Sequence, residues 1–183
     1  MPHRSVSIHM ITVIVSTNRT EAVSRQVAEY YQRLLTERDI PNQLLDLHDL
    51  PADFLTTALY ENNGQNQAFN AMSAVVADSN KLVFVVPEYN GSFPGILKTF
   101  IDALTYPSPL RDKKCALVGL SSGTQGASIA LSHLTDILNY LGTHVLALKA
   151  KLGMIEKYFD GQQFSHRVYR EVLDTQAEQL AKF

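Results

Sequence analysis

A run of hydroxyl, amide and guanidinium side chains, Ser16-Thr17-Asn18-Arg19-Thr20, follows an apolar segment at residues 10–15. Apolar residues at helical spacing begin at Val23, so the run lies just before the N-terminus of an expected helix. Free backbone N–H groups and the helix dipole favour an anion there, and Arg19 is able to bind two phosphate oxygens in parallel. Capping of the helix is the alternative, but capping needs only one Ser or Thr side chain. The several polar groups therefore favour an anion site.

A second unusual run, Pro87-Glu88-Tyr89-Asn90-Gly91-Ser92-Phe93-Pro94-Gly95, follows the most apolar segment of the chain. Gly91 and Gly95 permit close approach of the backbone, and the two prolines stiffen the ends of the loop. An aromatic wall beside backbone amides and polar side chains is the surface that a planar heterocycle needs. A simple turn between a strand and a helix is the alternative, and it requires fewer special residues. We therefore predict a ligand-binding loop.

A third run, Ser121-Ser122-Gly123-Thr124-Gln125-Gly126-Ala127-Ser128, is also rich in glycine and hydroxyl groups and also precedes an expected helix. Such turns are common, so this run is informative only if it lies beside the other two. The first loop matches neither the GxxxxGK[ST] nor the GxGxxG nucleotide-binding motif. The GxSxG motif of serine hydrolases is also missing. The three loops therefore point to ligand binding rather than to a nucleophilic side chain.

Composition excludes several other classes of chemistry. Sixteen Lys and Arg against eighteen Asp and Glu give a formal charge of −2. This balance does not indicate the basic surface that binding to nucleic acid or to a membrane needs. The single cysteine, Cys115, excludes an intramolecular disulfide and a cysteine-cage metal site, and its apolar neighbours predict a buried thiol. No metal-binding spacing links the six histidines, which are His3, His9, His48, His133, His144 and His166.

The cellular location follows from what the sequence lacks. The first residues contain no long apolar run of the kind found in signal peptides. The longest unbroken apolar run, residues 82–86, is far too short for a membrane helix. We therefore expect a protein of the reducing cytoplasm with no membrane partner.

The elements that must position these loops alternate between strands and helices. Strands are predicted at residues 10–15, 43–46, 81–86, 115–120 and 144–148. Helices are predicted around residues 23–34, 69–76, 94–104, 129–141 and 169–180, with a short helix inside the irregular segment 47–64. Five strands alternating with helices indicate one α/β domain over residues 1–183, with a parallel sheet covered on both faces. Ligands bind such sheets beyond the carboxyl ends of the strands, where all three loops lie.

At the second loop the chain resembles a known family. Residues 87–98, Pro-Glu-Tyr-Asn-Gly-Ser-Phe-Pro-Gly-Ile-Leu-Lys, are similar without a mismatch to the PEYNGSxPGxLK signature of the NADPH-dependent FMN reductases. That family has a flavodoxin-like fold and includes chromate-, quinone- and azo-reducing members. The resemblance extends from the first strand to Leu-Asn-Tyr-Leu-Gly at residues 138–142.

The resemblance implies a flavodoxin-like three-layer sandwich with a five-stranded parallel sheet in the order 2-1-3-4-5. It implies FMN as the cofactor and NADPH or NADH as the hydride donor. Because the flavin carries the redox chemistry, we expect no catalytic side chain, and the residue spacings predict no metal site. The helices at residues 94–104 and 129–141 would form a homodimer or homotetramer. The implied FMN-binding residues are Ser16, Thr17, Asn18, Arg19 and Ser24 for the phosphate, Pro87, Glu88, Tyr89, Asn90, Gly91 and Ser92 along the isoalloxazine, and Ser121, Ser122, Gly123 and Gly126 on the other side of the ring.

Two features depart from the family pattern. Glu21 places a carboxylate near the expected phosphate, which weakens FMN binding unless the side chain points to solvent. In the third loop Gly126 is followed by Ala127, Ser128 and Ile129, where relatives often have a second glycine and an arginine. Both changes bear on FMN affinity and leave the predicted fold intact.

The expected activity follows from the implied cofactor. We expect an FMN-dependent NAD(P)H oxidoreductase that passes hydride from NADPH through FMN to a small acceptor by a ping-pong scheme. The acceptor would be a flavin, a quinone, an azo compound or a metal oxyanion. A flavodoxin-type electron carrier without enzymatic activity is one alternative. A flavin-free binding or regulatory module on the same fold is the other.

Overall fold

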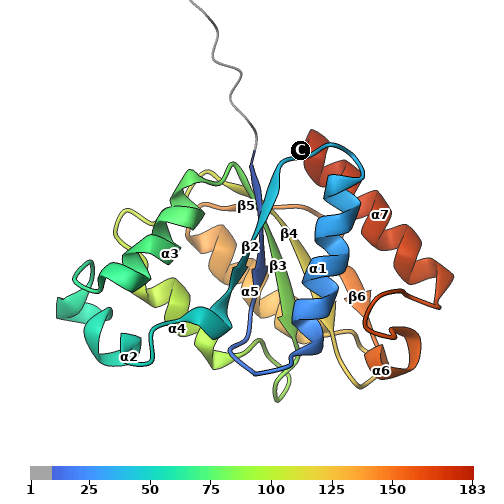
Figure 1. Cartoon of the computed structure of the whole chain (residues 1–183), viewed down its shortest axis with the longest axis horizontal. Coiled ribbons are helices and arrows are strands. Elements are labelled where there is room, and N and C mark those ends of the chain that lie inside the picture. The colour runs from blue at the N-terminus through green and yellow to red at the C-terminus, as the bar shows by residue number, and fades with distance from the viewer. Residues whose placement is uncertain (1–9) are drawn as a thin grey trace, which may run out of the picture.

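A computed structural model of the chain describes residues 10–183. The strands form one parallel sheet in the order β2-β1-β3-β4-β5 (Figure 1). Two short strands, β5 and β6, share the edge position beside β4, and both pair with it. The strand order confirms the flavodoxin-like arrangement predicted from the sequence. The predictions for the first residues, including His3 and His9, lie outside the described part of the chain. The strands are β1 (Ile11–Val15), β2 (Asn42–Asp46), β3 (Lys81–Pro87), β4 (Lys114–Leu120), β5 (His144–Val145) and β6 (Ala150–Leu152).

Alternate residues of the central strands face opposite sides of the sheet, and each side buries its own core. Ile14 and Phe84 pack against α3 (Gln67–Asp78), α4 (Gly95–Ala103) and α5 (Ser128–Tyr140). Val13 and Val83 pack against α1 (Val23–Thr36) and α7 (Arg167–Lys182) on the other side (Figure 1). Both faces are apolar because helices cover both, which explains the near-continuous apolar runs in the sequence.

The segment between β2 and α3 holds three short elements. They are the 3₁₀ turns η1 (Leu47–Asp49) and η2 (Tyr60–Asn62) and the helix α2 (Phe54–Thr57). Phe54 anchors the segment, because its ring stacks on Phe69 of α3 with centroids 5.7 Å apart. The expectation of a loop with a short helix inside is therefore confirmed.

The prediction of one strand at residues 144–148 is wrong. β5 ends at Val145, and β6 begins only at Ala150. The buried side chain of Gln176, from α7, fills the gap: its Nε2 donates to the carbonyl oxygens of Leu117 (3.0 Å) and Leu148 (2.8 Å). A side-chain amide thus replaces the backbone pairing that a continuous fifth strand would make with β4.

Candidate functional site

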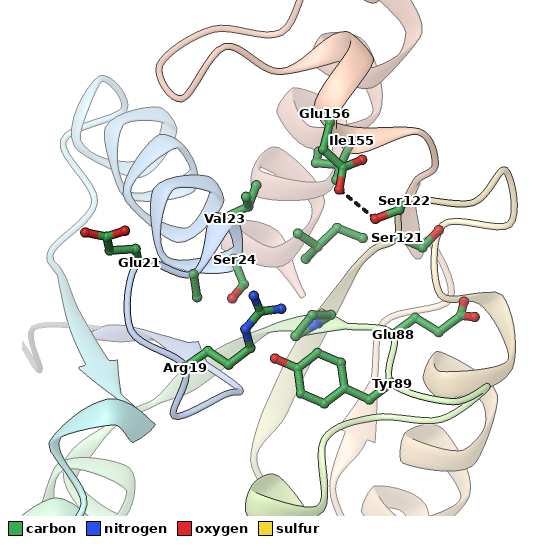
Figure 2. A pocket seen from close by; sticks show the side chains of 13 residues that line it. Arg19, Glu21, Val23, Ser24, Glu88, Tyr89, Ser121, Ser122, Ile155 and Glu156 are labelled. Atoms are coloured by element: carbon green, nitrogen blue, oxygen red, sulfur yellow. Dashed lines mark hydrogen bonds between the residues drawn. The ribbon is translucent and has the colours of Figure 1, made fainter.

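A cleft of about 190 Å³ opens at the carboxyl ends of β3 and β4, beside the N-terminus of α1 (Figure 2). All three predicted loops contribute to it, because the carboxyl ends of parallel strands meet at one edge of a sheet. A fourth wall comes from α6 (Ile155–Tyr158), which the sequence did not predict. The lining residues are Arg19, Glu21, Ala22, Val23, Ser24, Pro87, Glu88, Tyr89, Leu120, Ser121, Ser122, Ile155 and Glu156.

The first turn of α1 has no side-chain cap. Its N-cap residue is Ala22, which offers no hydrogen bond, and no acidic residue lies in the first turn. Capping by a Ser or Thr, the alternative interpretation of this loop, is therefore wrong. Within residues 10–183 the N–H groups of Val23 and Ser24 meet no acceptor, and they lie where the helix dipole favours an anion.

Ser24 and Arg19 lie together at this end of the cleft. Ser24 is only 2% exposed, and its hydroxyl oxygen has no hydrogen-bond partner among the described residues. Figure 2 shows this hydroxyl turned into the space that also holds the Arg19 guanidinium. A buried hydroxyl without a partner carries a desolvation cost of about 1–3 kcal/mol, which a bound ligand would relieve. We name Arg19, Ser24 and the free N–H groups of α1 the anion end of the cleft.

Ser16 and Thr17 support the cleft from outside its lining, whereas Asn18 is exposed and does not line it. Ser16 and Thr17 are buried, and the Ser16 N–H donates to the Val85 carbonyl at 3.1 Å. The Thr17 hydroxyl hydrogen-bonds to the Tyr89 hydroxyl at 2.9 Å. This bond joins the first loop to the second and fixes the tyrosine ring at the floor of the cleft (Figure 2).

The second loop contains a tight hairpin. Tyr89 and Ser92 exchange two backbone hydrogen bonds of 2.8 and 3.1 Å, and Asn90 and Gly91 between them have φ of 52° and 76°. Asn-Gly with positive φ at both positions is the preferred two-residue hairpin turn. The simple-turn alternative therefore accounts for Asn90, Gly91 and Ser92, which lie outside the cleft lining, while Pro87, Glu88 and Tyr89 line it.

The third loop packs tightly against β6 and α6. The backbone N–H groups of Met154 and Ile155 donate to the carbonyls of Gly123 (2.8 Å) and Ser121 (3.1 Å). Gly126 has φ of 55°, and a Cβ there would lie 2.5 Å from the Lys151 carbonyl carbon. Gly126 therefore holds the loop against β6, and the Gly123 carbonyl holds it against Met154 at the start of α6; neither glycine lines the cleft. Ser121 and Ser122 line the cleft itself.

Comparison with known proteins identifies the family. The family model described as NADPH-dependent FMN reductase matches residues 10–153. The chain belongs to this family. It is 33% identical over 134 residues to a 2-hydroxy-1,4-benzoquinone reductase from Burkholderia sp, covering 72% of this chain and 70% of that protein. It is 27% identical over 157 residues to a quinone reductase from Pseudomonas putida, covering 84% of this chain and 82% of that one. The family and these relatives are oxidoreductases.

A solved structure supports the same fold. The flavoenzyme NAD(P)H:(acceptor) oxidoreductase FerB from Paracoccus denitrificans aligns over 96% of both chains with a TM-score of 0.76 and 22% identity. No helix in residues 10–183 is both long and apolar enough to cross a membrane. No group of three or more His, Cys, Asp or Glu side chains in the same residues is placed to hold a metal ion.

The anion end fits the phosphate that an FMN reductase must hold. Its orphaned Ser24 hydroxyl, its free N–H groups and the Arg19 guanidinium are all donors, which suits a dianion. Glu21 does not oppose this, because Figure 2 shows its carboxylate pointing away from the cleft. The departure at Glu21 is therefore compatible with the family's cofactor.

Several residues of the cleft were missed by reasoning from the sequence. Leu120 ends an expected strand, and nothing in its type distinguishes it from a core residue. Ile155 and Glu156 belong to α6, whose four residues are too few to show helical periodicity. The Ser122 hydroxyl donates to the Glu156 carboxylate at 2.6 Å, a contact between positions 34 residues apart. Only the three-dimensional structure reveals such a pair.

Proposed function

We propose that the protein binds FMN in this cleft and uses it to oxidise NAD(P)H and reduce a small acceptor such as a quinone. The observation that carries the proposal is the uncapped N-terminus of α1, with the buried, unpartnered Ser24 hydroxyl beside Arg19. Bound FMN would supply the two-electron redox chemistry. The net reaction is NAD(P)H + H⁺ + quinone → NAD(P)⁺ + hydroquinone, which balances in atoms and electrons.

The chain's own residues would bind and orient rather than react. Arg19, Ser24 and the N–H groups of Val23 and Ser24 would hold the phosphate. Tyr89, fixed by its bond to Thr17, would place an aromatic edge beside the ring system. Positioning of two reactants at one site contributes to the rate without any catalytic side chain, and we assign none. The donor and the acceptor would occupy the same cleft in turn, which is a ping-pong scheme.

The experiment is reconstitution with FMN followed by initial-rate kinetics. After removal of excess FMN, the proposal predicts retained flavin and NAD(P)H oxidation that depends on added 1,4-benzoquinone. Double-reciprocal plots at several quinone concentrations should be parallel, as a ping-pong scheme requires. Intersecting lines would contradict the shared site. Retained flavin with no NAD(P)H oxidation would favour an electron carrier, and loss of flavin would favour a flavin-free module.

We also propose that two copies associate through α4 and α5. A groove between these helices is lined by Ile101, Leu104 and Ile137, and Tyr106 and Tyr140 at its edge are 97% and 90% exposed. Exposed aromatic side chains around an apolar groove are typical of protein interfaces. Light scattering should give the mass of a dimer or tetramer, and Tyr140→Glu should lower it. Tyr60→Glu, at a tyrosine exposed elsewhere, is the control; a monomeric wild type would contradict the proposal.

Two further points stay proposals from the sequence. We infer that residues 1–183 form one domain, which the shared sheet of the described residues supports. We also infer a cytoplasmic location, which rests on the sequence, where the single cysteine, Cys115, leaves no intramolecular disulfide.

A further inference from the structure

The cleft is polarised along its length. The cation Arg19 and the Ser24 hydroxyl lie at one end, and the carboxylates Glu88 and Glu156 lie toward the other, beside Ser121 and Ser122 (Figure 2). We name Glu88 and Glu156 the carboxylate end. Among the charged residues that line the cleft, Glu21 points away, so the remaining charges are one positive at the anion end and two negative at the carboxylate end.

The surrounding structure holds the Glu156 carboxylate and the backbone of Glu88 in place. Glu156 accepts the Ser122 hydroxyl at 2.6 Å, and its helix is tied to the third loop through the Ile155 N–H. Glu88 directly follows β3, and its backbone N–H donates to the Leu120 carbonyl at 3.0 Å. The Glu156 carboxylate therefore keeps a fixed position at the mouth of the cleft, and Glu88 adds a second negative charge to the same rim.

One cation, Lys157, follows Glu156 along the chain, and its ammonium lies over the Tyr158 ring, 5.1 Å from the centroid. The two carboxylates outweigh this single positive charge. Arg19, at the other end, would be matched by the phosphate of the cofactor. With FMN bound, the part of the cleft left open to an acceptor therefore carries net negative charge.

We propose that the carboxylate end selects neutral and cationic electron acceptors and discriminates against anionic ones, such as metal oxyanions and sulfonated dyes. This inference rests on the proposed function, because it specifies the acceptor for the same cleft. Fixed charges beside a binding site change the logarithm of the encounter rate with charged ligands in proportion to the product of the charges. Neutral quinones escape the penalty, which favours them over chromate-like anions.

The test uses two octahedral one-electron acceptors of opposite charge, ferricyanide and hexaammineruthenium(III). Each reaction balances as NAD(P)H + 2 acceptor(oxidised) → NAD(P)⁺ + H⁺ + 2 acceptor(reduced). The FMN-loaded wild type is compared with Glu88→Gln, Glu156→Gln and the double variant. Gln keeps the shape of the side chain and can still accept from Ser122. The matched control is Glu37→Gln/Glu61→Gln, which removes two exposed carboxylates outside the cleft.

The size of the effect follows from Coulomb's law. For two charges about 10 Å from a trivalent ion in water, their removal raises kcat/KM for ferricyanide roughly twenty-fold at about 10 mM ionic strength. Screening reduces the change to roughly three-fold at about 150 mM. For hexaammineruthenium(III) the change has a similar size and the opposite sign. In the control variant the ratio of the two acceptors should stay within about two-fold of the wild type.

An equilibrium measurement provides a readout independent of turnover. Hexacyanocobaltate(III) has the charge and shape of ferricyanide but is not reduced. Titrated into the FMN-loaded protein, it should perturb the flavin absorbance of the double variant at a lower concentration than that of the wild type. The shift should be about as large as the change in kcat/KM for ferricyanide and should shrink with added salt.

The outcomes separate the inference from the proposed function. A ratio of acceptors that moves as calculated in the double variant, and not in the control, supports the inference. Retained FMN and NAD(P)H oxidation with an unchanged ratio would overturn it and leave the proposed function intact. Loss of FMN, or no oxidation with either ion, would overturn both, because no acceptor reaction would remain to be selected.

Discussion

Replacement of Ser24 by alanine should change stability and FMN affinity in opposite directions. In the FMN-free protein the Ser24 hydroxyl is buried and has no partner among the described residues, so it opposes folding. Alanine removes this desolvation cost and is also the better helix former. In the proposed FMN complex, by contrast, the same hydroxyl would donate to a phosphate oxygen. The substitution therefore stabilises the empty protein and weakens the complex.

The magnitudes follow from the burial of the hydroxyl. An unsatisfied buried polar group costs about 1–3 kcal/mol, and the gain in helix propensity adds a few tenths. We expect the free energy of unfolding of FMN-free Ser24→Ala to rise by about 1–2 kcal/mol. A hydrogen bond to a charged phosphate contributes about 1.5–3 kcal/mol, so the Kd for FMN should rise roughly 10- to 150-fold.

Urea unfolding of the FMN-free protein and fluorescence titration with FMN measure the two effects. Ser128→Ala is the matched control, because this serine also begins a helix but its hydroxyl donates to the Gln125 carbonyl at 2.6 Å. The control should lose about 0.5–1.5 kcal/mol of stability and bind FMN normally. A destabilised Ser24→Ala, or one with an unchanged Kd, would refute the reasoning.

Three further predictions concern charge, backbone and burial. Arg19→Ala should raise the Kd for FMN about ten-fold or more and flatten its dependence on salt, measured by titration at two ionic strengths. Gly126→Ala should lower the free energy of unfolding by about 2–4 kcal/mol, because its φ is 55° and the new Cβ would meet Lys151 at 2.5 Å. Gly95→Ala, where a Cβ meets nothing within 4 Å, is the control for urea unfolding. Burial raises the pKa of the Cys115 thiol from 9.0 to about 12, so unfolding favours the thiolate. The contribution of this thiol to the free energy of unfolding is complete below pH 9.0 and is lost as the pH rises from 9.0 to about 12. Over this pH range Cys115→Ala should therefore lose less stability than the wild type. Equal losses in the two proteins would contradict the raised pKa of Cys115.

The arrangement of strands and helices could be predicted because both cores follow simple patterns. The apolar strands and the helical spacing of Val23, Val27 and Leu34 indicate a parallel sheet covered on both faces, and the structure confirms it. The split of the last strand could not be predicted. It depends on Gln176, which reaches across from α7 to satisfy Leu117 and Leu148. The local sequence at residues 144–148 cannot predict a hydrogen bond from a helix residue 28 positions further along the chain.

Residues of the candidate site could be predicted where polar side chains come directly after a strand. Arg19, Tyr89 and Ser121 line the cleft, as expected of loops at one edge of a sheet. Residues that shape the backbone of a loop were harder to distinguish from residues that line the cleft. Asn90 and Gly91 belong to the family signature, but in the structure they form a hairpin turn. Glu156 could not be predicted as a cleft residue, because its position depends on a hydrogen bond from Ser122 and on a four-residue helix.

The visible absorbance spectrum of the purified protein, after addition of FMN and removal of the excess, tests the central claim most directly. We expect retained oxidised flavin in stoichiometric amount, and bleaching of its visible band when NAD(P)H is added without oxygen. The same spectrum of Ser24→Ala should show less retained flavin. Absence of flavin from the wild type at saturating FMN, or a flavin that NAD(P)H does not bleach, would contradict it.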